Sequence, residues 1–153
     1  MLASRGFRLA QGPVTSVLLG MSGQRRRIQI NNSRGMPKVA KSADEAVSFI
    51  RSRDQLFVHG IAAVPHALVS ALVRRHDSLR QVEVFHLHTE GPAPYLDHPE
   101  SFHLTSFFVG HNARAATQRG EADFLPVFLS EVPLLFSRGH IKLDAALITV
   151  SPP

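Results

Sequence analysis

The sequence predicts an α/β fold with an open, mainly parallel sheet and flanking helices. Between residues 42 and 153, short apolar runs alternate with amphipathic stretches of helical spacing. Two of these apolar runs end at glycine, Gly60 and Gly110, as buried strands often do where the chain turns. Because alternating strands and helices build parallel sheets, ligands are expected at the loops beyond the carboxyl ends of the strands.

Strands and helices alternate through this body. The predicted strands cover residues 55–60, 81–87, 103–110, 123–127 and 144–150, and the predicted helices begin at residues 42, 65, 111 and 130. Ser42 and Glu45 have the spacing of a capping box, and Pro65 suits a first helical turn because its missing N–H is not needed there. Gly120 and Gly139 end the third and fourth helices.

Charge is divided unevenly along the chain. Of the 17 lysine and arginine residues, eight lie in residues 1–41, whereas all 12 acidic residues lie in residues 42–153. The nine remaining bases and 12 acids give this body a formal net charge of −3. Nucleic-acid binding needs basic side chains on the folded body, so nucleic acid is not an expected partner despite an isoelectric point near 10.7.

Residues 1–41 form a basic leader that is rich in arginine and serine and carries scattered apolar residues. This composition is typical of a mitochondrial transit peptide, so we expect a protein of the mitochondrial matrix whose leader is cut upstream of Ser42. A disordered tail outside the fold is the alternative. The absence of cysteine excludes disulfides and thiolate ligands, and no apolar run approaches the roughly 18 residues of a membrane span.

Common catalytic and cofactor motifs are missing from the sequence. It has no Gly-x-Ser-x-Gly nucleophile turn, no dinucleotide-binding Gly-x-Gly-x-x-Gly and no phosphate-binding loop. His86 and His88 are spaced to share one face of a strand. The further candidates His98, His103 and His111 have no recognised ligand spacing, so no metal site is expected.

Residues 60–65 stand out because they follow a predicted strand, open a predicted helix and have only small or apolar side chains. Their backbone N–H groups could face a carboxylate, a phosphate or a developing oxyanion. Ordinary close packing of a strand-to-helix turn around Gly60 is the alternative. The turn at Ser130 and Glu131 is equally ambiguous, because Ser130 could simply cap a helix and Glu131 could simply favour its positive end.

Short segments spread over residues 42–153 carry a family resemblance. They are residues 42–47, 59–65, 67–69, 108–110, Arg114, Gly120, Asp123, residues 126–128, 130–133 and 144–153. In this order and spacing they resemble the N-terminal domain of the acetyl-CoA hydrolase/4-hydroxybutyrate CoA-transferase family. The resemblance implies a CoA-transferase-like α/β fold with two related domains and an active site between them.

In this family a glutamate of the C-terminal domain attacks an acyl-CoA and forms a glutamyl–CoA thioester, which a second carboxylate resolves. The resemblance places that glutamate beyond Pro153, so it implies no catalytic residue in this chain. It also implies no bound cofactor, with the coenzyme A thioester entering as a substrate. The implied substrate-binding residues are Gly60, Ala62, Ala63, Pro65, Gly110, Ser130 and Glu131.

One position departs from the family pattern. Relatives often have a polar residue just before the proline of the first loop, where this chain has Ala63 and Val64. Carboxylate recognition is therefore not implied at that point.

The leading interpretation is the N-terminal domain of a mitochondrial CoA transferase that moves CoA between a short-chain acyl-CoA and a carboxylate. The sequence does not distinguish CoA transfer from acyl-CoA hydrolysis. A homo-oligomer is also compatible with it. A truncated, non-catalytic isoform that acts only as a folding or binding module is the alternative. The last predicted strand is expected to leave an edge or face of the sheet uncovered, which favours a chain that is part of a larger protein.

Overall fold

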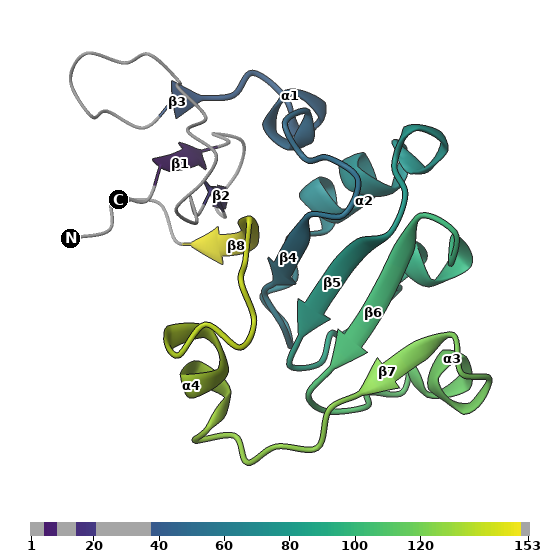
Figure 1. Ribbon diagram of the computed structural model, residues 1–153. Helices are drawn as coiled ribbons and strands as arrows, with labels where there is room; N and C mark the ends of the chain where they lie inside the picture. The colour runs from purple at the N-terminus through teal and green to yellow at the C-terminus, as the bar shows by residue number, and fades with distance from the viewer. Residues whose placement is uncertain (1–4, 9–14, 21–37, 151–153) are drawn as a thin grey trace.

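The computed structural model describes residues 5–8, 15–20 and 38–150, through which one sheet extends (Figure 1). Its strands are β1 (Arg5–Arg8), β2 (Thr15–Gly20), β3 (Lys38–Val39), β4 (Gln55–Val58), β5 (Val82–His86), β6 (Phe102–Ser106), β7 (Ala122–Phe124) and β8 (Ala145–Val150). Side by side, they follow the order β3-β1-β2-β8-β4-β5-β6-β7.

The strands from β8 to β7 in this order are all parallel, which confirms the predicted open, mainly parallel sheet. Leu56 of β4 pairs with Val84 of β5 on one side and with Ala145 of β8 on the other. Beyond β8 the sheet continues differently, because β2 is antiparallel to both β8 and β1. The short β3 pairs in parallel with β1.

In the described structure β8 is paired on both sides, so it is not the uncovered edge expected for the last predicted strand. The strands beyond it come from residues 1–41 and satisfy backbone groups that an edge strand would present to solvent. The role of these residues as an import signal stays a prediction.

The helices lie where the sequence predicts them, although they are short. They are α1 (Ala43–Val47), α2 (His66–Val73), α3 (Arg114–Gln118) and α4 (Val132–Ser137), with 3₁₀ turns η1 (His76–Ser78) and η2 (Pro94–Asp97) between them. At the start of α1, Ser42 Oγ accepts from the backbone N–H of Glu45 at 3.1 Å. The helix ends one turn later, where Ser48 Oγ donates to the Glu45 carbonyl at 2.7 Å and competes with further helical bonds.

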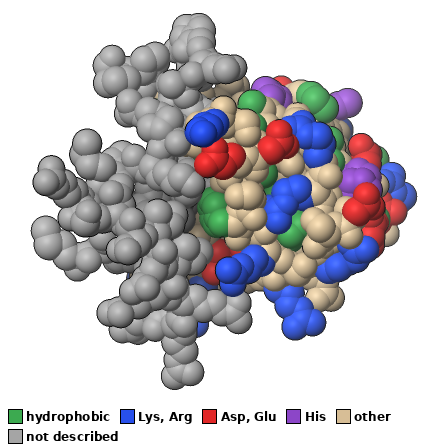
Figure 2. All heavy atoms as spheres, turned by 90° about the horizontal axis from the view of Figure 1, so that it is seen from above, with side chains coloured by type: hydrophobic (Ala, Val, Ile, Leu, Met, Phe, Trp, Pro, Cys, Tyr) green, Lys and Arg blue, Asp and Glu red, His purple; other side chains and the backbone are tan. Residues whose placement is uncertain are grey.

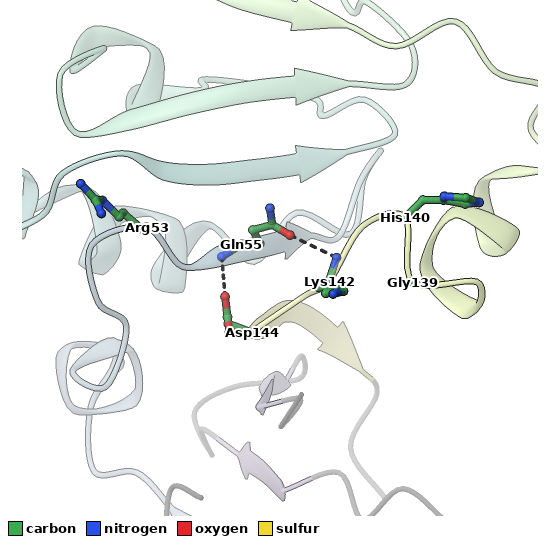
Figure 3. Close-up of a pocket in the computed structure, with 6 residues that line it drawn as sticks. All are labelled: Arg53, Gln55, Gly139, His140, Lys142 and Asp144. Atoms are coloured by element: carbon green, nitrogen blue, oxygen red, sulfur yellow. Dashed lines mark hydrogen bonds between the residues drawn. The ribbon is translucent and has the colours of Figure 1, made fainter. Parts of the chain in front are cut away.

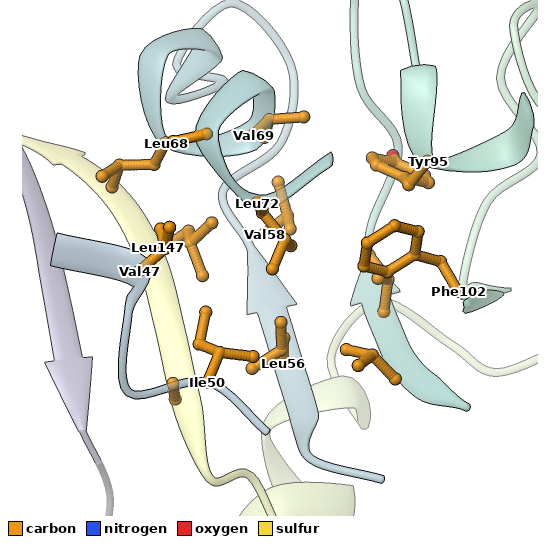
Figure 4. Packing of buried hydrophobic residues seen from close by; sticks show 14 of the residues in the cluster. Val47, Ile50, Leu56, Val58, Leu68, Val69, Leu72, Tyr95, Phe102 and Leu147 are labelled. Atoms are coloured by element: carbon orange, nitrogen blue, oxygen red, sulfur yellow. The ribbon is translucent and has the colours of Figure 1, made fainter. Parts of the chain in front are cut away.

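The aliphatic core lies between the parallel strands and the helices α1 and α2 (Figure 4). Leu56 and Val58 of β4, Leu72 of α2 and Leu147 of β8 are fully buried there. Side chains alternate across a strand, so Phe57 points to the opposite face of the sheet. Burial of each aliphatic side chain contributes about 1.5–3 kcal/mol, which makes this face the main source of stability.

The opposite face carries phenylalanines near the carboxyl ends of the strands. Phe136 of α4 lies edge-on to Phe57 and Phe107, with ring centroids 5.9 and 6.0 Å apart, and Phe107 stacks on Phe85 at 6.3 Å. These contacts hold α4 against this face. Toward the amino ends the same face is polar, with a row of cross-strand neighbours formed by Gln55, Glu83 and His103.

The surface of the described residues mixes charges of both signs. Figure 2 shows basic and acidic side chains interspersed over the face in view. Neutralising a row of phosphates would require a basic stripe instead. Within the described part of the chain, none of the helices has the length and apolar character needed to cross a membrane.

Candidate functional site

The loops that follow β4, β5 and β6 meet at the carboxyl edge of the parallel sheet. The backbone just after β5 lies between the other two loops. Ile61 N donates to the His88 carbonyl at 2.8 Å, and Asn112 Nδ2 donates to the Thr89 carbonyl at 3.1 Å. Ligands of open α/β sheets bind at this edge, so residues 59–65, 87–93 and 107–113 are named here the carboxyl-edge site.

Gly60 lies at the closest approach between the first two loops. It is buried, and a methyl group on its Cα would collide with the carbonyl oxygen of His88. A larger residue would push the two loops apart, so packing alone is enough to require glycine here. Gly60 therefore shapes the carboxyl-edge site by letting two backbones touch.

The rest of the first loop is more open. Ala62 is exposed and Ala63 is half-buried, while Pro65 is buried at the N-cap position of α2. Within the described residues, the backbone N–H of Ala62 donates no hydrogen bond. The β-branched Ile61 has a φ of 57°, an uncommon conformation of the kind that gathers at binding and catalytic sites.

Gly110 and Asn112 join the third loop to the second. A methyl group on Gly110 would lie 3.2 Å from Asn112 Oδ1 and 3.5 Å from His88 Cβ. Asn112 Nδ2 also donates to the Gly91 carbonyl at 2.9 Å, so its amide clamps the second loop. Its buried Oδ1 packs against Gly110 and has no hydrogen-bond donor among the described residues.

Ser130 and Glu131 make no described contact with this cluster of loops. Both are exposed in the segment that leads into α4. Glu131 is the N-cap residue of α4, and neither side chain forms a hydrogen bond within the described residues. The structure therefore unites Gly60 with Gly110 around His88 and leaves the turn at Ser130 and Glu131 apart from them.

Beneath the carboxyl-edge site, a buried chain of hydrogen bonds joins η2 to β5 and β6. His86 Nδ1 lies 3.1 Å from Tyr95 Oη, His86 Nε2 lies 3.0 Å from Ser106 Oγ, and Ser106 Oγ donates to the Phe108 carbonyl at 2.6 Å. Because the Ser106 hydroxyl donates to a carbonyl, it accepts from His86 Nε2–H, and Nδ1 accepts from the Tyr95 hydroxyl. The Ser106 proton thus faces a carbonyl and no general base, so this serine is not an activated nucleophile.

Burial sets the protonation of this chain. Burial first, and then the neighbouring His88, lower the pKa of His86 to about 4, and burial raises the pKa of Tyr95 to about 12. Both side chains are therefore neutral near pH 7. The chain supports the turn at Phe108 and thereby the approach of Gly110 to the second loop.

The two histidines that the sequence places on one strand face lie in different surroundings. His86 is fully buried, whereas His88 is half-buried, with Nε2 3.6 Å from Glu90 Oε1 and its ring centroid 5.6 Å from that of Phe108. The described residues include all nine histidines of the chain. Among the described residues, the side chains that lie close enough together to share a metal ion are His76, His98 and Glu100, at the amino ends of β5 and β6.

An open hollow lies where β4 and β8 begin, at the other end of these strands (Figure 3). It measures about 510 Å³ and is lined by Arg53, Gln55, Gly139, His140, Lys142 and Asp144. The Asp144 carboxylate accepts from Gln55 N at 2.9 Å, and Gln55 Oε1 accepts from Lys142 N at 3.1 Å. These bonds fasten the start of β8 to β4 and form no part of the carboxyl-edge site.

Two residues of the carboxyl-edge site escape sequence reasoning. Asn112 bonds to backbone more than twenty residues earlier in the chain, which the local sequence around it does not indicate. Ile61 has no sequence signal either, since its side chain gives no sign of the positive φ that the loop imposes.

The chain is an open, mainly parallel α/β domain, and its packed glycines lie at the sheet edge where such folds bind their ligands. Residues 24–153 match the acetyl-CoA hydrolase/transferase N-terminal domain. The chain belongs to this family, which confirms the resemblance carried by its sequence. The matched region begins inside the basic leader.

The curated relatives are CoA transferases. The chain is 46% identical over 119 residues to a succinyl-CoA:acetate/propanoyl-CoA:succinate CoA transferase of Fasciola hepatica, covering 76% of this chain and 25% of that protein. It is 36% identical over 115 residues to a 4-hydroxybutyrate coenzyme A transferase of Clostridium kluyveri, covering 73% and 27%. The chain thus spans about a quarter of the length of these relatives.

Solved structures of RipA share the fold. A RipA variant matches with a TM-score of 0.59 at 26% identity, over 64% of this chain and 25% of the RipA chain. RipA from Yersinia pestis matches with a TM-score of 0.54 at 23% identity, over 64% and 26%. Together with the family match, these likenesses confirm the CoA-transferase-like α/β fold.

Proposed function

We propose that this chain is the N-terminal domain of a CoA transferase that moves CoA between a short-chain acyl-CoA and a carboxylate, and that the carboxyl-edge site binds the acyl or carboxylate group. The observation that carries the proposal is the convergence of three loops on the backbone of His88 and Thr89. This convergence occurs at the sheet edge where ligands of such folds bind, in a family whose curated relatives are CoA transferases.

The polar groups at this edge suit an oxygen-rich substrate. The unpaired N–H of Ala62 can donate to a carboxylate or thioester oxygen, and α2, which begins at His66, adds the positive end of a helix. The exposed Ala62 and half-buried Ala63 leave space for a small acyl group. Recognition therefore rests on backbone donors, in keeping with the absence of a polar side chain before Pro65.

The nucleophile belongs to a part of the protein beyond this chain. By the family's chemistry it is a glutamate that takes up CoA as a glutamyl–CoA thioester and passes it to the second carboxylate. The carboxyl-edge site contains one acidic side chain, Glu90, which is exposed and lies 3.6 Å from His88. We assign Glu90 no nucleophilic role, because nothing around it orients it toward a substrate.

Exposed apolar side chains in the third loop of the site and in the segment leading into α4 support a two-domain arrangement. Phe108 is 61% exposed, and Phe128 and Leu129, in the segment leading into α4, are 77% and 67% exposed. Large exposed apolar groups of this kind mark interaction surfaces. In the proposed enzyme their occupant is the catalytic domain that carries the glutamate.

A chimera tests the proposal. Residues 24–153 replace the matching segment of the Fasciola hepatica transferase, and CoA transfer from succinyl-CoA to acetate is followed. The chimera should be active, the isolated chain inactive, and Glu90→Gln without effect in the chimera. Ala62→Trp should lower kcat/KM at least about tenfold, equivalent to 1.4 kcal/mol, because the indole would fill the substrate space.

Ala115→Trp, at an exposed alanine of α3, is the matched control and should leave kcat/KM unchanged. Melting temperatures separate loss of binding from loss of folding. Full activity of a folded Ala62→Trp chimera would remove the carboxyl-edge site from substrate binding. Turnover by the isolated chain would contradict a nucleophile that lies beyond it. An inactive but folded chimera would favour the non-catalytic binding module.

We further propose that residues 1–41 direct the protein to the mitochondrial matrix and are removed upstream of Ser42. Their eight basic and no acidic side chains support this proposal. Fused to a fluorescent protein, residues 1–41 should give a mitochondrial signal, which replacement of Arg25, Arg26 and Arg27 by glutamine should weaken. A diffuse signal from the unaltered leader would contradict the proposal.

A further inference from the structure

Two histidines and a glutamate gather at the amino ends of β5 and β6. One ligand atom each from His76, His98 and Glu100 lies within 4.8 Å of the other two. The imidazole rings stack, with centroids 3.9 Å apart and planes 19° from parallel, and His98 Nδ1 lies 3.8 Å from Glu100 Oε1. The cluster lies at the end of the sheet opposite the carboxyl-edge site, because it precedes strands whose carboxyl ends form that site.

A buried serine holds the backbone of both histidines. Ser101 Oγ donates to the His76 carbonyl at 2.7 Å, and Ser101 N donates to the His98 carbonyl at 3.0 Å. Ser101 is fully buried, and its own carbonyl accepts from Val82 N at 2.8 Å at the start of β5. The turn η1, which carries His76, and the segment between η2 and β6, which carries His98 and Glu100, are therefore tied together by the sheet before any ion arrives.

The side chains keep the freedom and the accessibility that an ion needs. The His76 and His98 side chains are 32% and 27% exposed, and Glu100 is 56% exposed. Ligand atoms around a tetrahedral zinc ion lie about 3.4 Å apart. Imidazole lone pairs lie in the ring plane, so the two rings must turn out of their stacked arrangement to share an ion, and their partial exposure leaves room for that rotation. His76 Nδ1 also lies 3.4 Å from Asp77 Oδ1, a carboxylate of the kind that orients metal-binding imidazoles.

We propose that His76, His98 and Glu100 form a surface site for a divalent transition-metal ion such as Zn²⁺. Two imidazoles and one carboxylate suit zinc, copper or nickel, whereas magnesium and calcium prefer oxygen ligands. Three protein ligands leave a coordination position for water or an exogenous group. The bound ion would link η1 to η2 and stabilise the folded chain.

Isothermal titration of Zn²⁺ into the tag-free 153-residue chain tests the site. Saturable binding of one ion per chain is expected, with a rise in melting temperature. His98→Ala should weaken binding on the order of 10- to 100-fold or more, because loss of even an outer-shell partner of a metal has an effect of that size. Glu100→Gln, a change of similar volume at an exposed position, should weaken binding without altering the fold measured by circular dichroism.

His103→Ala is the matched control, since His103 is also partly exposed and lies 3.0 Å from a carboxylate, that of Asp123. It should bind Zn²⁺ as the unaltered chain does. The proposal is overturned if no saturable binding at one ion per chain is seen, or if His98→Ala and Glu100→Gln bind as tightly as His103→Ala. Because the measurement is of binding alone, its outcome is independent of the proposed transferase function.

Discussion

The two faces of the parallel sheet are built in different ways. On the face covered by α1, α2 and η2, aliphatic side chains such as Leu72 are fully buried, and the buried polar groups include the chain from Tyr95 through His86 to Ser106. On the opposite face, Phe136 closes an aromatic cluster under α4, and polar groups such as His103 and Asp123 remain substantially exposed.

This difference separates the parts that hold the domain together from the parts that can interact. The first face has little solvent exposure, so substitutions there should cost stability through cavities or unpaired polar atoms. The second face is partly exposed to solvent, and its aromatic rings are only partly covered. Ion pairs there contribute little to the free energy of unfolding. We therefore expect a steep gradient of mutational effects between the two faces.

The largest effect is expected at Leu72, which is fully buried in α2. Leu72→Ala should lower the free energy of unfolding by about 2–5 kcal/mol, because it removes buried methyl groups and leaves a cavity. Urea denaturation measures the change, with Ser70→Ala at an exposed position of the same helix as control. A loss no greater than the control's would mean that this face does not carry the core.

Low pH should destabilise the folded chain through His86, on the same face of the sheet. The pKa of His86 is lowered to about 4 in the folded chain against about 6.5 when unfolded, so the unfolded state binds the proton first as the pH falls. Stability should therefore be full above pH 6.5 and fall by about 3 kcal/mol between pH 6.5 and 4. Denaturation of the unaltered chain and of His86→Gln across this range isolates the contribution, and parallel pH profiles would contradict it.

The aromatic cluster should give an intermediate effect. Phe136→Ala removes a half-buried ring from contact with Phe57 and Phe107, with an expected loss of about 2 kcal/mol, less than for a fully buried ring. Leu134→Ala, at a position of α4 that is 38% exposed, is the matched control and should cost less. Equal losses for the two variants would show that α4 is not anchored by this ring.

The smallest effect is expected for the hydrogen-bonded pair Asp123 and His103. Their side chains are 70% and 36% exposed, so Asp123→Asn should change the free energy of unfolding by less than about 1 kcal/mol. The pKa of the neighbouring Glu83 is raised by burial, lowered by His103 and raised by Asp123. Because Asp123→Asn removes a negative charge that raises this pKa, the substitution should lower the pKa of Glu83. Urea denaturation measures the change in the free energy of unfolding, and NMR titration measures the pKa of Glu83. A loss of more than about 2 kcal/mol in the free energy of unfolding would contradict the contrast between the two faces.

The carboxyl-edge site could be predicted only in part. A small-residue turn after a predicted strand pointed to the loop at Gly60, and the strand pattern placed Gly110 at the same edge of the sheet. The role of Asn112 depends on contacts with Thr89 and Gly91, more than twenty residues earlier, which spacing along the chain does not reveal. Ser130 and Glu131 match the family pattern in sequence, but in the described structure they make no contact with the other loops. A sequence match alone therefore does not show which residues lie together.

The sequence by itself determined the local elements and their order, because capping residues, turn glycines and apolar periodicity act over a few neighbouring residues. The Ser42 cap and the glycines after α3 and α4, both with positive φ, are formed by such local forces. Only the tertiary structure decided that Gly60 touches His88, that Ser106 donates to a carbonyl, and that His76 meets His98. These contacts join residues far apart in the chain, and they depend on the strand order and on close packing of the whole domain.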